Sequence, residues 1–287
     1  MKQNRVILAG STGYLGKHLI KELQLHRIPF IAIARSKAKL KGFSLLDDQI
    51  IEAEVTQPAT LKNIIGKSDI VISTIGITRQ EDGLTYHEVD YQANLNLLQE
   101  AKEAEASKFM YVSVLNGENM RHLKIIAAKE AFVDELKTSG INYCIIRPNG
   151  FFSDMKDFLN MASKGRVHLF GNGEFLFNPI HGADLAQVII DQLNTPETAI
   201  EVGGPEILTQ NELAKLAFTA LDKPVKITHW PDWTRKALIR FLRSFFTVKT
   251  YGPYEFFLSM MSQDNIAPRY GVMRLKDFFR EESDRIQ

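Results

Sequence analysis

A glycine-rich turn near the start of the chain restricts the possible folds more than any other sequence feature. It comes directly after the apolar run 5–9 and directly before residues 17–23, in which apolar residues recur at helical spacing. The turn consists of Gly10, Ser11, Thr12, Gly13, Tyr14, Leu15 and Gly16. A buried strand, a glycine-rich turn and the start of a helix, in this order, are the parts that a dinucleotide-binding site requires.

The three glycines of this turn have different expected tasks. Gly10 lets the chain turn sharply, Gly13 lets the backbone approach a pyrophosphate, and Gly16 lets the helix pack closely on the strand. The helix N-terminus supplies free N–H groups and the positive end of its dipole to the phosphates. A plain tight turn is the alternative, but the strand before it and the helix after it favour a dinucleotide site. We therefore expect that the chain binds a dinucleotide or descends from proteins that did.

The composition is that of an ordinary globular protein. Apolar residues make up 45% of the chain and charged residues 24%, and the formal net charge of +1 gives no indication of a nucleic-acid partner. The single cysteine, Cys144, excludes an intramolecular disulfide, and its apolar neighbours favour an inert buried thiol over a nucleophile. The sequence contains no metal-ligand cluster and no apolar run near the roughly 18 residues of a membrane span, and strand 5–9 begins too early for a secretory signal. We expect a cytoplasmic protein.

Short strand-like runs alternate with helical patterns through the first two hundred residues, which predicts parallel βαβ units. Strands are expected at 30–34, 50–54, 69–74, 108–112, 141–146 and 199–202, and helices at 87–105 and 125–138. Residues 1–205, with the return strand at 199–202, are therefore expected to form a Rossmann-like, doubly wound parallel sheet.

The chain changes character after Gly203. Thr209 and Glu212 form a capping-box pattern that predicts a helix at 210–221, and the following segment is unusually aromatic. Residues 206–287 are expected to form a smaller helical, aromatic-rich cap over the carboxyl edge of the sheet, where ligands bind in such folds.

The residue after the second expected strand indicates which cofactor is preferred. An NAD site usually has Asp or Glu there, to accept hydrogen bonds from the ribose 2′-hydroxyl. This chain has Arg35, whose guanidinium matches a 2′-phosphate in charge and in paired donors. Ser36, Lys37 and Lys39 add donors in the same loop, although such residues can also be solvated surface groups. The pattern favours NADP(H) over NAD(H).

Several later motifs occur together in a known superfamily. They are Ser-Thr-Ile-Gly at 73–76, Ala-Lys-Glu at 128–130, Ile-Ile-Arg-Pro-Asn-Gly-Phe-Phe at 145–152, and the segments 178–186 and 202–209. With the glycine turn they cover most of residues 1–210, and the chain resembles the atypical, NmrA-like branch of the short-chain dehydrogenase/reductase superfamily. Within that branch it is most similar to divinyl chlorophyllide 8-vinyl-reductase-like proteins. The resemblance implies further cofactor contacts from Thr74, Gly76, Lys129, Pro148, Asn149 and Phe151.

The chain departs from the superfamily at its usual catalytic residues. That chemistry uses a Tyr four residues before a Lys, so that the ammonium lowers the phenol pKa, and a Ser at the end of the preceding strand. Lys129 resembles this lysine and Ser113 this serine, which makes both candidate catalytic residues, but Ile125 occupies the tyrosine position. Lys129 can also be a ribose-binding residue or a surface lysine, and Glu130 is expected to be a solvated charge.

Two histidines are alternative candidates for acid–base chemistry. His122 could replace the missing proton donor but fits a surface histidine better, and His181 with Asp184 resembles a dyad. Asp184 fits better as an acid at the N-terminus of the helix that follows it.

Three function classes remain open. The first is an NADP(H)-dependent oxidoreductase that reduces an activated double bond or carbonyl in a small apolar or conjugated substrate. The second is a non-catalytic NADP(H)-binding regulator or assembly factor of the NmrA type, and the third is an epimerase-like isomerase, against which the missing tyrosine counts. The sequence does not indicate the oligomeric state.

Residues 233–246 form a basic amphipathic pattern. Leu238, Phe241, Leu242 and Phe245 make one apolar stripe at 3.6 residues per turn, and Arg235, Lys236, Arg240 and Arg243 surround it. Such a helix can close over an active-site cleft, lie on an anionic membrane as a peripheral contact, or dock on a partner.

Overall fold

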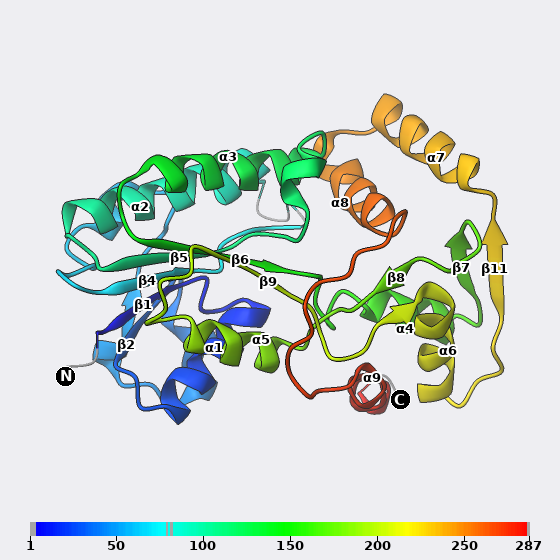
Figure 1. The fold of residues 1–287 in the computed structure, drawn as a ribbon, viewed down its shortest axis with the longest axis horizontal. Coiled ribbons are helices and arrows are strands. Elements are labelled where there is room, and N and C mark those ends of the chain that lie inside the picture. The colour runs from blue at the N-terminus through cyan, green and yellow to red at the C-terminus, as the bar shows by residue number, and fades with distance from the viewer. Residues whose placement is uncertain (1–3, 79, 81–82, 286–287) are drawn as a thin grey trace. The chain divides into compact units, whose positions relative to one another are not determined.

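The computed structural model describes residues 4–78, 80 and 83–285, and the chain forms two compact units (Figure 1). We call Met1–Arg147 with Leu185–Ile200 the sheet unit. Pro148–Asp184 with Glu201–Gln287 form the C-terminal unit.

A seven-stranded sheet with the order β3-β2-β1-β4-β5-β6-β9 forms the centre of the fold. Its strands are β1 (Val6–Ala9), β2 (Phe30–Ala34), β3 (Ile50–Glu52), β4 (Ile70–Ser73), β5 (Lys108–Val112), β6 (Tyr143–Pro148) and β9 (Ala199–Val202). The neighbours from β3 to β6 pair in parallel, with Ala9 in register with both Ile33 and Ser73. The strand order reverses between β1 and β4, as in doubly wound folds, so the expected fold class is confirmed.

Helices cover both faces of this sheet. Figure 1 shows α2 (Asn94–Glu103) and α3 (Lys124–Thr138) on one face, and α1 (Tyr14–Leu25) and α5 (Gly182–Asp191) on the other. Short 3-10 segments, η1 (Lys37–Phe43), η2 (Asp47–Gln49), η3 (Pro58–Leu61) and η5 (Gly117–Met120), lie in the connections.

The segment before α2 differs from the single helix expected at 87–105. Residues His87–Ala93 form a π-helix, η4, and only then does the α-helix α2 begin. The buried Asn94, the first residue of α2, donates through its side chain to the carbonyl oxygens of Val89 (3.3 Å) and Asp90 (3.0 Å) in η4 and accepts a hydrogen bond from the Ser73 hydroxyl at the end of β4 (2.5 Å). The periodicity of apolar residues does not separate these helix types, because it contains no information about such polar contacts. π-Helical turns are rare and are frequent at functional sites.

Burial on both faces explains the apolar sequence of the central strands. Every residue of β1, β2, β4 and β5 is buried, as expected for a parallel sheet covered on both sides. Cys144 in β6 is completely buried, and this burial raises the pKa of its thiol. It is therefore the inert thiol that the sequence predicted.

The C-terminal unit is built from short strands and helices. Its elements are α4 (Lys156–Ser163), β7 (Val167–Phe170), β8 (Leu176–Phe177), β10 (Leu208–Thr209), α6 (Gln210–Ala220), β11 (Ile227–Trp230), α7 (Asp232–Phe245), α8 (Val248–Met260) and α9 (Leu275–Asp284). β7 pairs in parallel with β11, and β8 pairs antiparallel with β10. The predicted capping box is present at the start of α6, where Thr209 N donates to Glu212 Oε2 (2.7 Å) and Glu212 N donates to Thr209 Oγ1 (3.1 Å).

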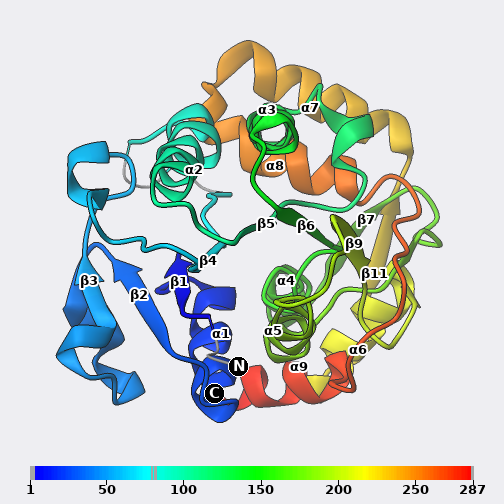
Figure 2. The ribbon, with the colours of Figure 1, turned by 60° about the vertical axis from the view of Figure 1, so that its left-hand side comes forward.

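The division into units differs from the boundary expected at residue 205. Residues 148–184 belong to the C-terminal unit, because their apolar side chains share its core. Phe158 and Val167 pack there with Phe218 and Phe279 from α6 and α9. Figure 2 shows α4, α6 and α9 gathered in one part of the structure. The sequence pattern alone did not reveal that the chain leaves the sheet unit after Arg147, returns once at Leu185 and leaves again after Ile200.

Candidate functional site

The glycine turn is held tightly between β1, β4 and α1. Gly10 has φ +83°, and a Cβ at this position would collide with Thr74 Oγ1. A Cβ at Gly16 would lie 2.7 Å from the Ser11 Cα, so only glycine lets α1 approach the turn this closely. Gly13 is the N-cap residue of α1, and the first turn of this fully described helix has no acidic side chain. Backbone N–H groups and the positive helix end therefore face the turn, as a bound pyrophosphate requires.

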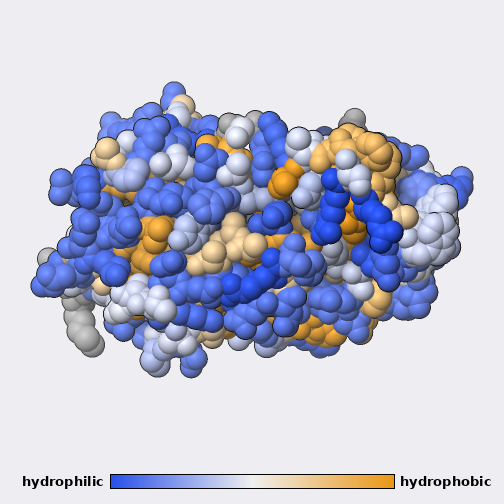
Figure 3. Space-filling model, turned by 90° about the horizontal axis from the view of Figure 1, so that it is seen from above, coloured by the Kyte–Doolittle hydropathy of each residue, from blue (hydrophilic) through white to orange (hydrophobic). Residues whose placement is uncertain are grey.

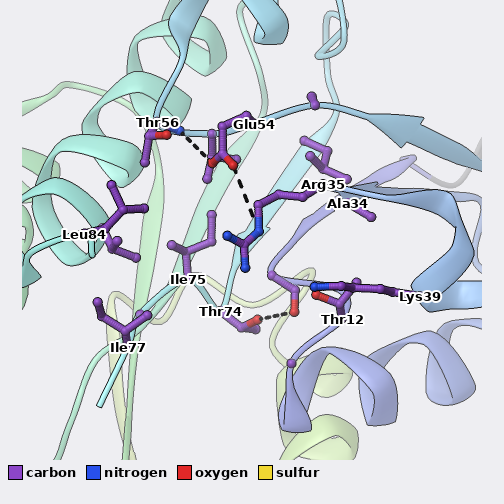
Figure 4. Close-up of a pocket in the computed structure, with 17 residues that line it drawn as sticks. Thr12, Ala34, Arg35, Lys39, Glu54, Thr56, Thr74, Ile75, Ile77 and Leu84 are labelled. Carbon is purple, nitrogen blue, oxygen red and sulfur yellow. Dashed lines mark hydrogen bonds and ion pairs between the residues drawn. The ribbon is translucent and has the colours of Figure 1, made fainter. Parts of the chain in front are cut away.

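A cavity of about 390 Å³ opens beside this turn, within the sheet unit (Figure 4). Gly10, Thr12 and Gly13 line it from the turn, and Thr74 and Gly76 line it from the segment after β4. Ile33, Ala34, Arg35, Lys39, Ala53, Glu54, Val55, Thr56, Ile75, Ile77, Leu84 and Val89 complete the lining. The cavity thus lies at the carboxyl ends of β1, β2 and β4, where the strand order reverses and where ligands bind in open α/β sheets.

Charged side chains of both signs line one side of the cavity. Arg35 follows β2, and its Nε lies 4.0 Å from Glu54 Oε2. Lys39 points toward Thr12 of the glycine turn (Figure 4). Sequence analysis missed Glu54, although parallel pairing of β2 with β3 brings residues after the two strands to the same edge. The cavity therefore offers donors to an anion, and one carboxylate competes for the Arg35 guanidinium.

Other residues of the predicted cofactor set lie outside the cavity lining. The buried Ser11 hydroxyl donates to the Ile33 carbonyl oxygen (2.6 Å) and so ties the turn to β2. In α1, the Tyr14 ring packs edge-on against His18, and Leu15 is buried. Ser36 precedes η1 as its N-cap residue. Cofactor contact by these four side chains stays a prediction.

Lys129 belongs to a buried ionic cluster directly behind Gly76. Its Nζ lies 2.7 Å from Asp90 Oδ1, and Asp90 is completely buried in η4. The second carboxylate oxygen accepts a hydrogen bond from Ile77 N (3.2 Å). A Cβ at Gly76 would lie 2.5 Å from Lys129 Nζ, so the glycine allows this close approach. The ring of the buried Tyr111 lies alongside, with its centroid 5.8 Å from the ammonium.

The electrostatics of this cluster favour a permanently charged Lys129. Burial by itself lowers the pKa of Lys129, but the Asp90 carboxylate and the Tyr111 hydroxyl outweigh it and raise the pKa above its usual value. Burial also raises the pKa of Tyr111. Sequence reasoning missed Asp90 and Tyr111, because neither lies at helical spacing from Lys129. The superfamily pattern has a tyrosine four residues before the lysine, and in this chain that position holds the buried Ile125.

Ser113 belongs to a second buried cluster. Its hydroxyl donates to Glu130 Oε1 (2.9 Å), and Arg147 binds the same carboxylate through Nη1 (2.7 Å) and Nη2 (2.9 Å). The expectation that Glu130 is a solvated charge is wrong, since its exposed fraction is 0%. The adjacent Gly117 makes room for this carboxylate and for Arg147. A catalytic role for Ser113 stays a prediction, and the geometry shows that its hydroxyl supports a buried ion pair.

The remaining cofactor candidates lie at the start of the C-terminal unit. Pro148 ends β6, the buried Asn149 donates to Asn178 Oδ1 (2.6 Å), and Phe151 N donates to Asp154 Oδ2 (3.0 Å). These contacts hold the loop in its own unit. The expected approach of Pro148, Asn149 and Phe151 to the nicotinamide stays a prediction.

His181 and Asp184 do not form the dyad that their spacing suggested. His181 Nδ1 accepts a hydrogen bond from Ala183 N (3.2 Å). Asp184 Oδ2 accepts from the backbone N–H groups of Val272 (3.0 Å) and Met273 (2.9 Å). Asp184 therefore fixes a distant loop rather than only the start of α5. His122 is exposed, and among the residues that the structure describes no group of three His, Cys, Asp or Glu side chains is placed to hold a metal ion.

The glycine turn, the strand order and the adjacent cavity define a dinucleotide-binding protein of the Rossmann-like class. A protein-family model described as NAD(P)H-binding matches residues 10–196, and the chain belongs to this family. The match agrees with the atypical, NmrA-like classification that the sequence motifs indicated.

Curated relatives include both an enzyme and an assembly factor. The chain is 27% identical to the chloroplastic divinyl chlorophyllide a 8-vinyl-reductase of Cucumis sativus, over 97% of this chain and 76% of the relative. It is 22% identical to the photosystem II assembly factor Ycf39 of Synechocystis sp., over 84% of this chain and 74% of the relative.

Solved structures share the fold at lower identity. The structure described as AtPrR2 with NADP+ and (+)pinoresinol has a TM-score of 0.77 and 17% identity, over 98% of this chain and 99% of that one. An isoflavone reductase has a TM-score of 0.75 and 16% identity, over 98% and 100%. At these identities the likeness shows the fold alone.

Proposed function

We propose that the protein binds NADP(H) in preference to NAD(H). The observation that carries this proposal is the position of Arg35 and Lys39 in the wall of the cavity, next to the end of β2. In dinucleotide sites of this class the ribose 2′ substituent lies at that position. A guanidinium there binds a 2′-phosphate by charge and by paired donors, and no acidic residue directly follows β2.

Titration of NADPH and NADH tests this preference. Charge-assisted hydrogen bonds contribute about 1.5–3 kcal/mol each, so NADPH is expected to bind roughly tenfold to a hundredfold more tightly. Arg35→Ala should remove most of the difference and Lys39→Ala part of it. Lys41→Ala is the matched control, because Lys41 lies in the same η1 segment but not in the cavity lining. Equal affinities in the unmodified protein would refute the proposal.

We further propose that the protein is an oxidoreductase that reduces an activated double bond or carbonyl of an apolar substrate. NADPH supplies the hydride in such chemistry. The support is the family membership and the similarity to a vinyl reductase across nearly the whole chain. Within the sheet unit, the glycine turn and Arg35 would bind and orient the dinucleotide, and Lys129 would keep a fixed positive charge behind Gly76.

A non-catalytic NADP(H)-binding regulator or assembly factor is the second candidate, and one observation favours it. The two residues that resemble catalytic groups, Lys129 and Ser113, are engaged by the buried carboxylates of Asp90 and Glu130. Ile125 also removes the usual proton donor, which counts against an epimerase-like isomerase as well.

NADPH oxidation separates these candidates. The protein is incubated with NADPH and a panel of enones, quinones and vinyl-substituted conjugated compounds, and absorbance at the cofactor band is followed. Turnover of at least one class of compound, with a higher KM for NADPH in Arg35→Ala than in the unmodified protein, supports the oxidoreductase. Tight NADPH binding with no turnover across the panel favours the regulator.

A further inference from the structure

Helix α7 presents a row of large apolar side chains to solvent. None of its residues, all of which the structure describes, is buried. Trp233 is 69% exposed, Phe241 52% and Phe245 72%. At 100° per residue, Phe241, Phe245 and Leu238 fall on one arc of the helix, and Phe241 and Phe245 pack against each other with ring centroids 4.8 Å apart. Soluble surfaces rarely gather apolar groups in this way without an interaction to serve.

The exposed arc is not the side by which α7 is attached to its neighbour α8. Ile239 and Leu242 are only partly exposed, and at 100° per residue they follow the arc beyond Leu238, on the side away from Phe241. Arg243 forms an ion pair with the buried Glu255 of α8. The stripe expected from sequence is therefore divided, with Leu242 partly covered and Phe241 and Phe245 left outside. α7 is fixed in place while its aromatic arc remains available.

Positive charge gathers on a second side of this helix. At 100° per residue, Lys236, Arg240 and Arg243 lie together there, mostly opposite the arc and with Arg240 nearest to Phe241. We call these three residues, with Lys249 just beyond the helix, the basic flank. Asp232 is the acidic residue in this helix, and it pairs with Arg235 and Lys236. Figure 3 shows hydrophobic surface beside strongly hydrophilic surface on its right-hand side, where α7 lies. An exposed aromatic arc on one side and a basic flank on the other is the pattern of helices that lie in the plane of an anionic membrane surface.

We propose that α7 docks the protein on anionic lipid, with the aromatic arc in the headgroup region and the basic flank attracted to the anionic surface. Charge complementarity selects this occupant, since Lys and Arg near an anionic leaflet each strengthen binding. The contact is peripheral, because no helix in the described part of the chain is long and apolar enough to cross a membrane.

The two tryptophans of the chain provide a direct readout, because both are exposed: Trp230 ends β11 just before α7, and Trp233 lies in the first turn of α7. The full chain is mixed with vesicles of phosphatidylcholine alone, or with about a third phosphatidylserine, and binding is followed by tryptophan emission and by co-sedimentation. We expect a blue shift and pelleting with the anionic vesicles only. Raising the salt concentration should release the protein, since the attraction acts within a Debye length.

Matched variants separate the charge and the aromatic contributions. Arg240→Glu/Lys249→Glu should weaken binding by at least about 25-fold, since each cation near the surface contributes about fivefold. Phe241→Ser/Phe245→Ser should abolish the blue shift. Lys102→Glu and Val272→Ser are the controls, an exposed cation and an 81% exposed apolar residue outside α7. Circular dichroism verifies that each variant is folded.

Three results would overturn the proposal. The first is the absence of binding to anionic vesicles, and the second is equal binding by the α7 variants and their controls. The third is concentration-dependent self-association in sedimentation velocity that depends on Phe241 and Phe245, which would identify a second copy as the occupant.

Discussion

Replacing Asp90 by Asn tests whether the buried charge behind Gly76 depends on its partner. Asn keeps the shape and can still accept the hydrogen bond from Ile77 N, so the variant removes little except the negative charge. The Lys129 side chain, 14% exposed, then lacks its counter-charge. Breaking a buried ion pair in this way costs about 3–5 kcal/mol. For a chain of this size that corresponds to a fall in Tm of about 6–20 °C.

A double-mutant cycle measures the coupling itself. Lys129→Met leaves the Asp90 carboxylate unpaired, whereas Asp90→Asn/Lys129→Met removes both charges and should recover much of the lost stability. The free energy of unfolding is measured for all four proteins by urea titration followed by circular dichroism. If the stability lost in the double variant equals the sum of the losses in the two single variants, the reasoning is refuted, because the two groups then do not interact.

The pH dependence of Lys129→Met provides a second check. Burial raises the pKa of Asp90, and Lys129 opposes that rise. Without Lys129 the folded protein holds a proton on Asp90 at pH values where the unfolded chain has lost it. Stability must then fall as the pH rises above the unfolded carboxyl pKa of about 4. The variant should therefore lose more stability relative to the unmodified protein at pH 8 than at pH 5.

Three further outcomes follow from the remaining contacts. Glu54→Gln should raise the ratio of NADPH to NADH affinity by roughly twofold to fivefold, because it removes the carboxylate 4.0 Å from Arg35; parallel titrations at low salt measure it. Glu130→Ala should destabilise the fold by about 3–5 kcal/mol in urea unfolding, since it leaves the Arg147 guanidinium buried without its main partner. Burial lowers the pKa of His181 in the folded protein below its unfolded value of about 6.5. The free energy of unfolding should therefore decline as the pH falls below about 6.5. In His181→Gln, unfolding between pH 8 and pH 5 should show a smaller decline, and an unchanged decline would contradict this.

Local sequence signals identified most of the sheet. The predicted strands at 30–34, 108–112 and 199–202 have the bounds of β2, β5 and β9, because buried parallel strands are short apolar runs between turn residues. The glycine turn and the capping box at Thr209 were equally visible, since each depends on residues close together in the chain. The strands β7, β8, β10 and β11 were not predicted, because β8 and β10 have only two residues and polar residues interrupt the apolar pattern of β7 and β11.

Only those residues of the candidate site that directly follow a predicted strand were predicted from sequence. Arg35 and the turn follow strands directly, so sequence position indicates their place in the cavity. The π-helix η4 brings Asp90 to Lys129, and the pairing of β2 with β3 brings Glu54 to Arg35. Neither contact can be read from the spacing of these residues along the chain. Glu130 was misjudged for the same reason, because its partner Arg147 lies in another element.

The path of the chain between the two units has a consequence for how the protein can be made and dissected. The chain crosses from one unit to the other after Arg147, after Asp184 and after Ile200. No single backbone cut therefore releases either unit intact, and limited proteolysis at an exposed loop should leave fragments that remain associated. During synthesis the sheet cannot acquire its edge strand β9 until the whole first segment of the C-terminal unit has been made. The two units thus complete their folding in an interleaved order, with α9 as the last helix to join.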